Sequence, residues 1–491
     1  MPHPTMPART VRILVAVVAA LTITATACSS DSGTDSAGSA GNSVTGTLKV
    51  PQDYPTIQKA VDAAAPGALV LVDKGVYKEA VDVTQDTRKK TDPRDITIRG
   101  VDRNEVILDG GFKLDNGIRI LGSEGIVLEN MTARNYLSNG FYWTGVKRYR
   151  GSYLTAYRNG DYGIYSFDAY DGQFDHSYGS GSPDAGFYIG ECFKCNAVID
   201  HVRSEYNGLG YSGTNSGGDL FIINSEFDNN RAGVVPSSGS YELCYPSRDT
   251  TVAGNLVHDN NYLEGGGIDV SLLAQGNGIL PAGAVRATIT KNQVWNHNRT
   301  GIGLVPFPES DANDVAPPKA AWDTPCSDTH DKPAKGIPAE QCKAVEVIGT
   351  GCVVLWNPKD NTVTDNVVSG SGAADLAVGT VDLTGSGETT DTLGNCWSNN
   401  TAATTRPADL QQLAPCTGAA SGGDWTANQL DLLTLMGQQP PKPEKNAYRN
   451  TPVPPKQENM PNATTAKAPR FTGPEKVDVA SITVPPKPAG S

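Results

Sequence analysis

Carboxylates in neighbouring repeats are the first candidates for chemistry in this sequence. Asp161 and Asp184 lie 23 residues apart, each two residues before a glycine, and Arg231 takes the same place further along the chain. If the repeats stack as parallel strands about 4.8 Å apart, the two carboxylates repel each other unless a cation or a guanidinium lies nearby. We therefore take Asp161, Asp184 and Arg231 as candidate catalytic residues and consider a Ca²⁺ or uronate site. Two solvated turn aspartates are the alternative.

A row of tyrosines is the candidate binding surface. Tyr142, Tyr165 and Tyr188 each stand two residues after successive glycines, so stacked repeats would place their rings on one face. If that face is exposed, the flat amphipathic rings suit stacking against sugars along a polymer. The alternative is an aromatic ladder covered by a loop.

These residues must be positioned by a repeat in which a glycine precedes an apolar residue. Its first five copies are spaced by 23, 23, 24 and 23 residues, and we expect two more copies after longer loops. The copies are Gly140-Phe141, Gly163-Ile164, Gly186-Phe187, Gly210-Tyr211, Gly233-Val234, Gly267-Ile268 and Gly301-Ile302. A coil of three short strands uses roughly 20 to 25 residues, and the Leu-x-x-Leu-x-Leu pattern of leucine-rich repeats does not occur in these segments. The sequence therefore predicts an all-β protein with the fold of a right-handed parallel β-helix.

A second series of mostly polar residues runs in phase with the glycines. Its members are Asn130, Ser152, His176, His201, Asn224, Asn255, Asn292 and Asn366. Because Asn adopts turn conformations and can bond its copy in the next coil, we expect one row of stacked corner residues. An acid–base or metal-binding role stays open for His176 and His201, which stand beside Asp175 and Asp200, whereas His258-Asp259 falls in the following turn of its coil.

Both ends of such a solenoid need caps, because open ends expose strand edges and core. Residues 56–65 predict an amphipathic helix at the first end, and residues 406–436 contain helical segments that would form a cap at the other. We assign residues 48–405 to the β-helix. Residues 437–491 are rich in Pro and Lys, which predicts a disordered or polyproline II tail.

The N-terminal segment predicts export. Arg9 and Arg12 precede an apolar run that is too short for a membrane-spanning helix of roughly 20 residues, so residues 1–27 read as a signal peptide. The sequence Ala25-Thr26-Ala27-Cys28 resembles the lipobox of bacterial lipoproteins, which implies lipidation of Cys28 and anchoring in the membrane. Cleavage near Ala27 without lipidation is the alternative. Residues 28–47 would form a flexible tether.

Charge and cysteine content narrow the partners. A net charge of −13 argues against a nucleic-acid partner, which requires a basic surface. Apart from Cys28 there are eight cysteines, an even number that indicates disulfides in an oxidising compartment. Cys192-x-x-Cys195 could instead be half of a metal site or a redox pair. We expect a monomer.

The entry to the predicted solenoid carries a family resemblance. Tyr54-Pro55-Thr56-Ile57-Gln58, followed by Gly75-Val76-Tyr77-Lys78-Glu79, resembles the first segment of pectin methylesterases and of the pectin-lyase-like superfamily. The resemblance implies a β-helix from about residue 48 to about residue 416. The esterases carry paired catalytic Asp residues and an Arg in later coils, and their characteristic segments have no counterpart here. Gln85-Asp86-Thr87 imitates one of them but stands too early, so methylesterase activity is not expected.

Two classes of function follow. The first is an exported, membrane-anchored surface protein that binds a glycan or another extracellular partner along the solenoid. The second is a carbohydrate-active enzyme, that is, a polysaccharide lyase, epimerase or hydrolase. A resemblance to exported β-helix proteins that assist metal-enzyme maturation is a third possibility, for which these residues supply no ligand pattern.

Overall fold

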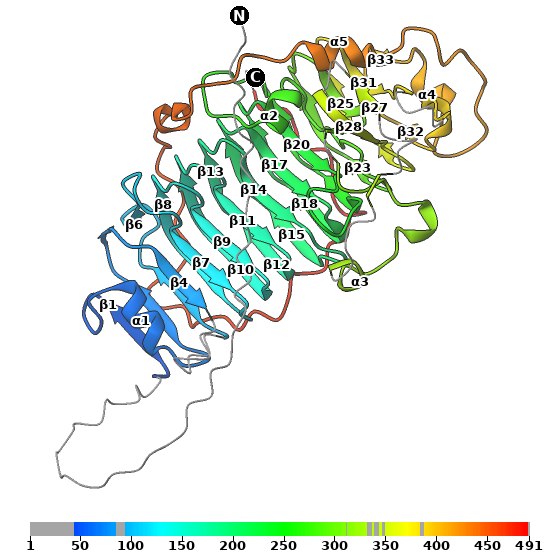
Figure 1. Cartoon of the computed structure of the whole chain (residues 1–491). Coiled ribbons are helices and arrows are strands. Elements are labelled where there is room, and N and C mark those ends of the chain that lie inside the picture. The colour runs from blue at the N-terminus through cyan, green and yellow to red at the C-terminus, as the bar shows by residue number, and fades with distance from the viewer. Residues whose placement is uncertain are drawn as a thin grey trace, which may run out of the picture. The chain divides into compact units, whose positions relative to one another are not determined.

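The chain folds into stacked coils of short parallel strands. The structure is a computed structural model that describes residues 44–84, 94–310, 312–330, 336–337, 343–345, 349–382 and 387–489. Figure 1 shows the coils following one another from β1 and α1 at one end to β32 and α4 at the other. This confirms the predicted all-β fold, a right-handed parallel β-helix with short helical end caps.

One face of the β-helix is a seven-stranded parallel sheet to which each of these coils contributes one strand. It is here called the tyrosine sheet. Its strands, in spatial order, are β4 (Val81–Thr84), β7 (Ile118–Leu121), β9 (Phe141–Thr144), β11 (Ile164–Phe167), β14 (Ala185–Gly190), β17 (Leu209–Thr214) and β20 (Ala232–Ser237). Bridges through Ile279 link this sheet to a further parallel set, β25 (Thr300–Leu304), β31 (Ala374–Val378) and β33 (Thr405–Arg406).

The rest of each coil belongs to a 20-stranded sheet with two columns. The first column comprises β1 (Thr47–Val50), β2 (Leu69–Val72), β5 (Thr97–Gly100), β8 (Val127–Arg134), β10 (Lys147–Tyr157), β12 (Tyr170–Asp175), β15 (Ala197–Asp200), β18 (Gly217–Ile223), β21 (Arg248–Ala253), β23 (Thr288–Thr290), β29 (Thr362–Thr364) and β32 (Cys396–Ser398). The second comprises β3 (Gly75–Tyr77), β6 (Val106–Asp109), the ends of β8 and β10, β13 (Tyr178–Ser180), β16 (Arg203–Glu205), β19 (Glu226–Asp228), β22 (Leu256–His258), β24 (Gln293–Trp295) and β30 (Val367–Ser369).

Insertions between strands carry the remaining elements. An antiparallel set is formed by β26 (Phe307–Ser310), β27 (Lys343–Val345) and β28 (Gly349–Trp356). The helices are α1 (Ile57–Ala63), α2 (Asp269–Leu273), α3 (Ser327–His330), α4 (Leu410–Leu413) and α5 (Leu432–Gly437), with 3₁₀ turns η1 (Lys319–Ala321), η2 (Thr390–Thr392) and η3 (Ala447–Asn450). In the described part of the chain, none of these helices is both long and apolar enough to cross a membrane.

The repeat glycines form a column because the coils leave no room for a side chain there. A Cβ on Gly140 would stand 2.7 Å from the carbonyl oxygen of Gly163, and one on Gly163 would stand 2.6 Å from that of Gly186. The predicted copy at Gly267 is wrong: a Cβ on Gly233 would meet Gly278, which is the next member of the column. The loop that contains α2 is inserted in this coil and displaces the repeat.

The polar series predicted as one row divides into two rows offset by one residue, and Ser152 belongs to neither. His176, His201 and Asn224 occupy an exposed corner with φ of 47°, 52° and 47°. Asn255 and Asn292 lie one position later, inside the coil, where the Asn255 side-chain amide donates to Asn292 Oδ1 at 3.0 Å. Ser152 pairs with Glu129 and so precedes the corner. Buried amides that bond from coil to coil satisfy each other's donors and acceptors in the core.

Helices cap both ends. Ile57 and Ala60 of α1 are fully buried, and Thr56 caps the helix by accepting a hydrogen bond from the backbone of Lys59 at 3.1 Å. At the other end Leu410 of α4 joins the core. Within residues 406–436 the helical parts are α4 and the start of α5. The predicted tether ends earlier than expected, because Val44 already pairs with Ala64. The predicted signal peptide and Cys28 lie outside the described residues.

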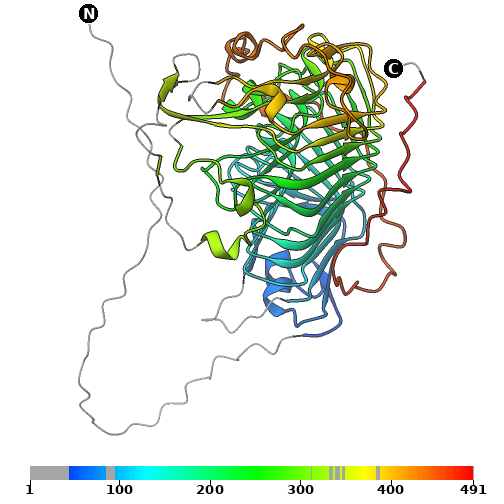
Figure 2. The same ribbon diagram turned by 90° about the vertical axis from the view of Figure 1, so that its right-hand side faces the viewer.

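Residues 437–489, predicted as a disordered or polyproline II tail, run along the body and are held by its cations. The buried Arg99 donates to Ala466 O at 2.6 Å, Arg103 donates to Glu458 O at 3.1 Å, and Lys291 donates to Val479 O at 2.9 Å. Figure 2 shows this orange-to-red segment beside the coils. A Pro-rich extended chain makes few internal hydrogen bonds, so its carbonyl groups are available to such donors.

Three disulfides join described cysteines: Cys192–Cys195, Cys244–Cys326 and Cys396–Cys416. They confirm the disulfide interpretation for these six residues, including the Cys192-x-x-Cys195 pair. Cys342 lies outside the described residues.

Candidate functional site

The tyrosine row exists and lies on the outer face of the tyrosine sheet. Tyr142, Tyr165 and Tyr188 are paired in register on β9, β11 and β14, and their rings stack with centroids 5.0 and 4.8 Å apart. The residues before them, beginning with Phe141 and Ile164, point into the core. Alternation along each strand therefore sends the rings outward.

The row is open at one end and covered at the other. Tyr142 and Tyr165 are half-buried, whereas Tyr188 is 1% exposed. Tyr162 packs against both Tyr165 and Tyr188, at 4.6 and 4.9 Å between ring centroids. The structure thus combines the two arrangements considered from the sequence, a partly exposed ring at Tyr142 and a covered ladder at Tyr188.

The two predicted aspartates are brought together beside this row. The backbone of Asp184 donates to Asp161 O at 3.2 Å, and Tyr162 bonds the Asp184 carboxyl group through its hydroxyl. Burial raises the pKa of both carboxyl groups, and the charge of Asp161 raises the pKa of Asp184 further. A pair of this kind holds a proton at pH values where exposed aspartates are ionised.

Arg231 has a different role from the one predicted. Its guanidinium donates to three carbonyl oxygens of the loop before α2, those of Leu263, Gly265 and Gly266, at 2.6, 2.9 and 3.0 Å. A fourth bond, of 3.1 Å, reaches Gln275 Oε1. Arg231 therefore holds this loop on the coil rather than bridging Asp161 and Asp184.

A third carboxyl group, which sequence reasoning missed, completes the site. Glu242 lies in the loop between β20 and β21 and accepts a hydrogen bond from Tyr188, whose hydroxyl is 2.8 and 2.7 Å from its two oxygens. Burial raises the pKa of Glu242 to about 8, and the charges of Glu191 and Asp184 add to the effect. No repeat position marks this residue, because it belongs to an insertion.

The site continues into a hollow along the outer face of the helix. Next to Glu242, Tyr241 is 44% exposed and lines a cavity of about 500 Å³ together with Phe307, Glu309 and Met436. Carboxyl groups, phenols and a flanking cavity on one face are features of a site for a polyhydroxylated ligand.

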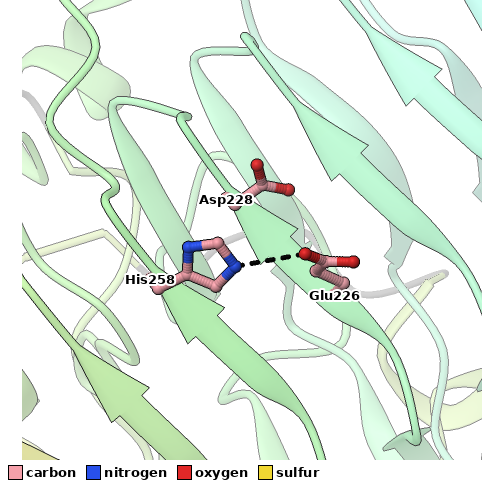
Figure 3. Close-up of side chains that lie close together, drawn as sticks. All are labelled: Glu226, Asp228 and His258. Atoms are coloured by element: carbon pink, nitrogen blue, oxygen red, sulfur yellow. Dashed lines mark hydrogen bonds and ion pairs between the residues drawn. The ribbon is translucent and has the colours of Figure 1, made fainter. Parts of the chain in front are cut away.

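A group that could hold a metal lies on another face. Within the described residues, Glu226 and Asp228 of β19 and His258 of β22 bring three ligand atoms within 4.8 Å of one another (Figure 3). The Ca²⁺ site suggested at Asp161 and Asp184 stays a prediction.

The fold places the chain among right-handed parallel β-helices. Residues 139–306 match the family model described as right handed beta helix region. No curated protein matches the chain.

Three solved structures have a similar architecture. The A-module of the mannuronan C-5 epimerase AlgE4 of Azotobacter vinelandii is 14% identical, with a TM-score of 0.43 over 74% of this chain and 92% of that chain. ORF18 of Geobacillus virus E2 is 12% identical, with a TM-score of 0.43 over 73% and 63% of the two chains. An alginate lyase of Paenibacillus sp. is 12% identical, with a TM-score of 0.37 over 73% and 99%.

Proposed function

We propose that the protein is an exported carbohydrate-active enzyme that works by acid–base catalysis on the outer face of the tyrosine sheet. The observation that carries the proposal is the cluster of three carboxyl groups with raised pKa values, Asp161, Asp184 and Glu242, beside the stacked tyrosines. A carboxyl group that keeps its proton near neutral pH can protonate a leaving oxygen, and an ionised neighbour can activate water.

The roles follow from the environment of each group. Asp184 is 7% exposed, and the negative charge of Asp161 raises its pKa further. We therefore assign the role of general acid to Asp184. Asp161 is half-buried and lies nearer to solvent, so we assign the base to it. Glu242 orients Tyr188 through their hydrogen bond. Tyr142, at the open end of the row, would stack on a sugar ring next to the reacting unit.

The substrate that fits these groups is a neutral glycan. The groups around Asp184 are carboxyl groups and phenols, and two guanidiniums that could have neutralised a uronate have other partners: Arg231 is bonded to a loop, and Arg119, in register with Tyr142, pairs with Asp82 at 2.8 Å. A hydrolase on a neutral polysaccharide is therefore favoured over a lyase or epimerase on a uronate.

Glycan binding without catalysis is the second candidate. It is favoured by the tyrosine row itself, since three rings stacked at 5.0 and 4.8 Å form a continuous surface that requires no acid or base. Under either function we place the protein outside the cytoplasm, anchored by a lipid on Cys28 and monomeric. The disulfides agree with an oxidising compartment.

A glycan array combined with turnover assays on the same polymers tests the proposal. Asp184→Asn should lower turnover by about 100-fold or more while leaving glycan binding in place. Tyr142→Ala should weaken binding. Asp219→Asn, at an exposed position of β18 on the 20-stranded sheet, is the matched control for Asp184→Asn. Binding without turnover would select the second candidate, an unsaturated product would select lyase chemistry, and no binding would overturn both.

A further inference from the structure

A second cluster of polar side chains lies on the other sheet, away from the proposed glycan site. Glu226 and Asp228 are two residues apart on β19, so they project from the same side of the strand. Asp228 is paired in register with His258 on the next coil. Figure 3 shows the imidazole of His258 directed at Glu226 with Asp228 beside them, and ligand atoms of the three residues lie within 4.8 Å of one another.

Both ring nitrogens of His258 face carboxylates, so that only a doubly protonated ring donates a hydrogen bond to each of them. Its Nδ1 lies 2.8 Å from Asp259 Oδ2 and its Nε2 lies 3.1 Å from Glu226 Oε1, while the ring stacks on Trp295 at 4.1 Å. A neutral imidazole carries one N–H group. When Nδ1–H donates to Asp259, the lone pair of Nε2 and the oxygen of Glu226 are two acceptors in contact, and a cation between them removes the repulsion.

The hydrogen bond to Asp259 is also the arrangement found around metal-binding histidines. A ligating imidazole usually donates its other N–H to a carboxylate or carbonyl, which fixes the tautomer and the ring orientation. Stacking on Trp295 fixes the ring plane as well. His258 is therefore held with Nε2 aimed at Glu226.

The cluster carries an excess of negative charge, which also favours a bound cation. Four carboxyl groups, those of Glu205, Glu226, Asp228 and Asp259, are in contact with the guanidinium of Arg203 and the imidazole of His258. Arg203 bonds Asp228 at 3.0 Å and Glu205 at 3.1 Å. If a cation coordinates one oxygen of the Asp228 carboxylate, Arg203 still has its ion pair with Glu205, so the guanidinium is not left unpaired.

We propose that Glu226, Asp228 and His258 bind one divalent transition-metal ion, with Zn²⁺ as the best fit. An imidazole nitrogen with two carboxylate oxygens is a ligand set for Zn²⁺ or Mn²⁺, whereas Ca²⁺ and Mg²⁺ prefer oxygen alone. Glu226 and Arg203 also line a groove of about 820 Å³ between the body and the tail, next to His176 and His201. A fourth ligand, water or an oxygen of a bound molecule, would enter from this groove.

Isothermal titration of the EDTA-treated protein with ZnCl₂ tests the site. We expect one ion per chain, and a loss of affinity of about 10-fold or more in both His258→Asn and Glu226→Gln. Asp249→Asn is the matched control, because Asp249 and Asp323 flank Arg286 in a cluster of carboxylates that lacks histidine.

A thermal shift and competition with other ions provide the second readout. Zn²⁺ should raise the melting temperature of the native protein and the control but not of His258→Asn, and CaCl₂ should not reproduce the shift. Absence of stoichiometric binding, or equal binding by His258→Asn and the native protein, would overturn the proposal. Circular dichroism confirms that each variant is folded.

Discussion

The hydroxyl of Tyr188 lies 2.7 Å from Oε2 of Glu242, 54 residues further along the chain. This contact joins the covered end of the tyrosine row to the loop between β20 and β21. Tyr188 is 1% exposed, whereas Glu242 is half-buried, and burial raises the pKa of its carboxyl group to about 8. The hydrogen bond between Tyr188 and Glu242 therefore fixes the loop between β20 and β21 against the tyrosine row.

Removing this hydroxyl should destabilise the protein without emptying the core. Tyr188→Phe keeps the ring and leaves a half-buried carboxyl group without its donor, which costs about 1–3 kcal/mol of the free energy of unfolding. Urea unfolding followed by circular dichroism measures the change. Tyr142→Phe is the control, because Tyr142 is half-buried at the open end. Equal stability of the two variants would contradict the linking role.

Stability should fall as the pH rises through the titration range of Glu242. Its pKa is about 8 in the folded protein against the ordinary value of 4.5. Between these values the folded state binds more protons than the unfolded state, so the free energy of unfolding decreases with pH and levels off above the higher value. Glu242→Gln removes this dependence and should be more stable than the native protein at about pH 8. Urea titrations at several pH values check the slope, part of which remains because of Asp161 and Asp184.

The repeat glycines should not accept a methyl group. Gly163→Ala places a Cβ 2.6 Å from the carbonyl oxygen of Gly186, and the backbone of the neighbouring coil must move to admit it. We expect a loss of about 1–3 kcal/mol of stability, the usual range for overpacking. In the control Gly75→Ala, the Cβ meets the ring of Tyr77 at 3.3 Å, so a smaller loss is expected. An unchanged free energy of unfolding in Gly163→Ala would contradict this steric explanation.

The fold could be predicted because its main constraint recurs in many coils. At Gly140, Gly163 and Gly210 a Cβ would meet the carbonyl oxygen of the next repeat glycine, so the steric requirement appears in the sequence as a period. Insertions interrupt that period, which is why Gly267 was taken for Gly278. The side chains of Tyr142, Tyr165, Tyr188, Asp161 and Asp184 stand at repeat positions, and the structure places them together for the same reason.

The contacts that the sequence did not reveal are those made by insertions and by the tail. Glu242 reaches Tyr188 from a loop whose conformation follows no repeat, and Arg231 was misassigned because its carbonyl partners lie in another such loop. Composition predicted a disordered or polyproline II tail. It did not show that arginines some 360 residues away would hold its carbonyl groups.

Membrane anchoring should depend on Cys28. Cys28→Ser removes the lipidation site implied by the lipobox-like sequence, and the protein should then move from the membrane fraction to the soluble exported fraction. One acyl chain binds a membrane only marginally, and stable anchoring takes more than one. Cell fractionation with immunoblotting measures the distribution. Retention of the Cys28→Ser variant at the membrane would point to another attachment.

The tail should stabilise the body through the arginines that it covers. Deleting residues 456–489 removes the carbonyl partners of Arg99 at Ala466 and Lys467 and uncovers the apolar patch of Val198, Ile223 and Ala253, against which Val477 and Ile482 pack. Arg99 keeps its ion pair with Glu129 at 2.7 Å. We expect the free energy of unfolding to fall by about 1–3 kcal/mol, the scale for a buried donor that loses its partner, because water replaces part of what is lost.

A double-mutant cycle separates the arginine contacts from general coverage by the tail. Arg99→Lys lacks the planar fork that reaches Glu129 and the tail at once, so it should destabilise the full chain more than the truncated one. The tail segment supplied as a separate peptide should restore stability to the truncated protein with native Arg99 and should restore less to the Arg99→Lys form. Additive effects of the substitution and the truncation would show that the tail stabilises the body without the help of Arg99.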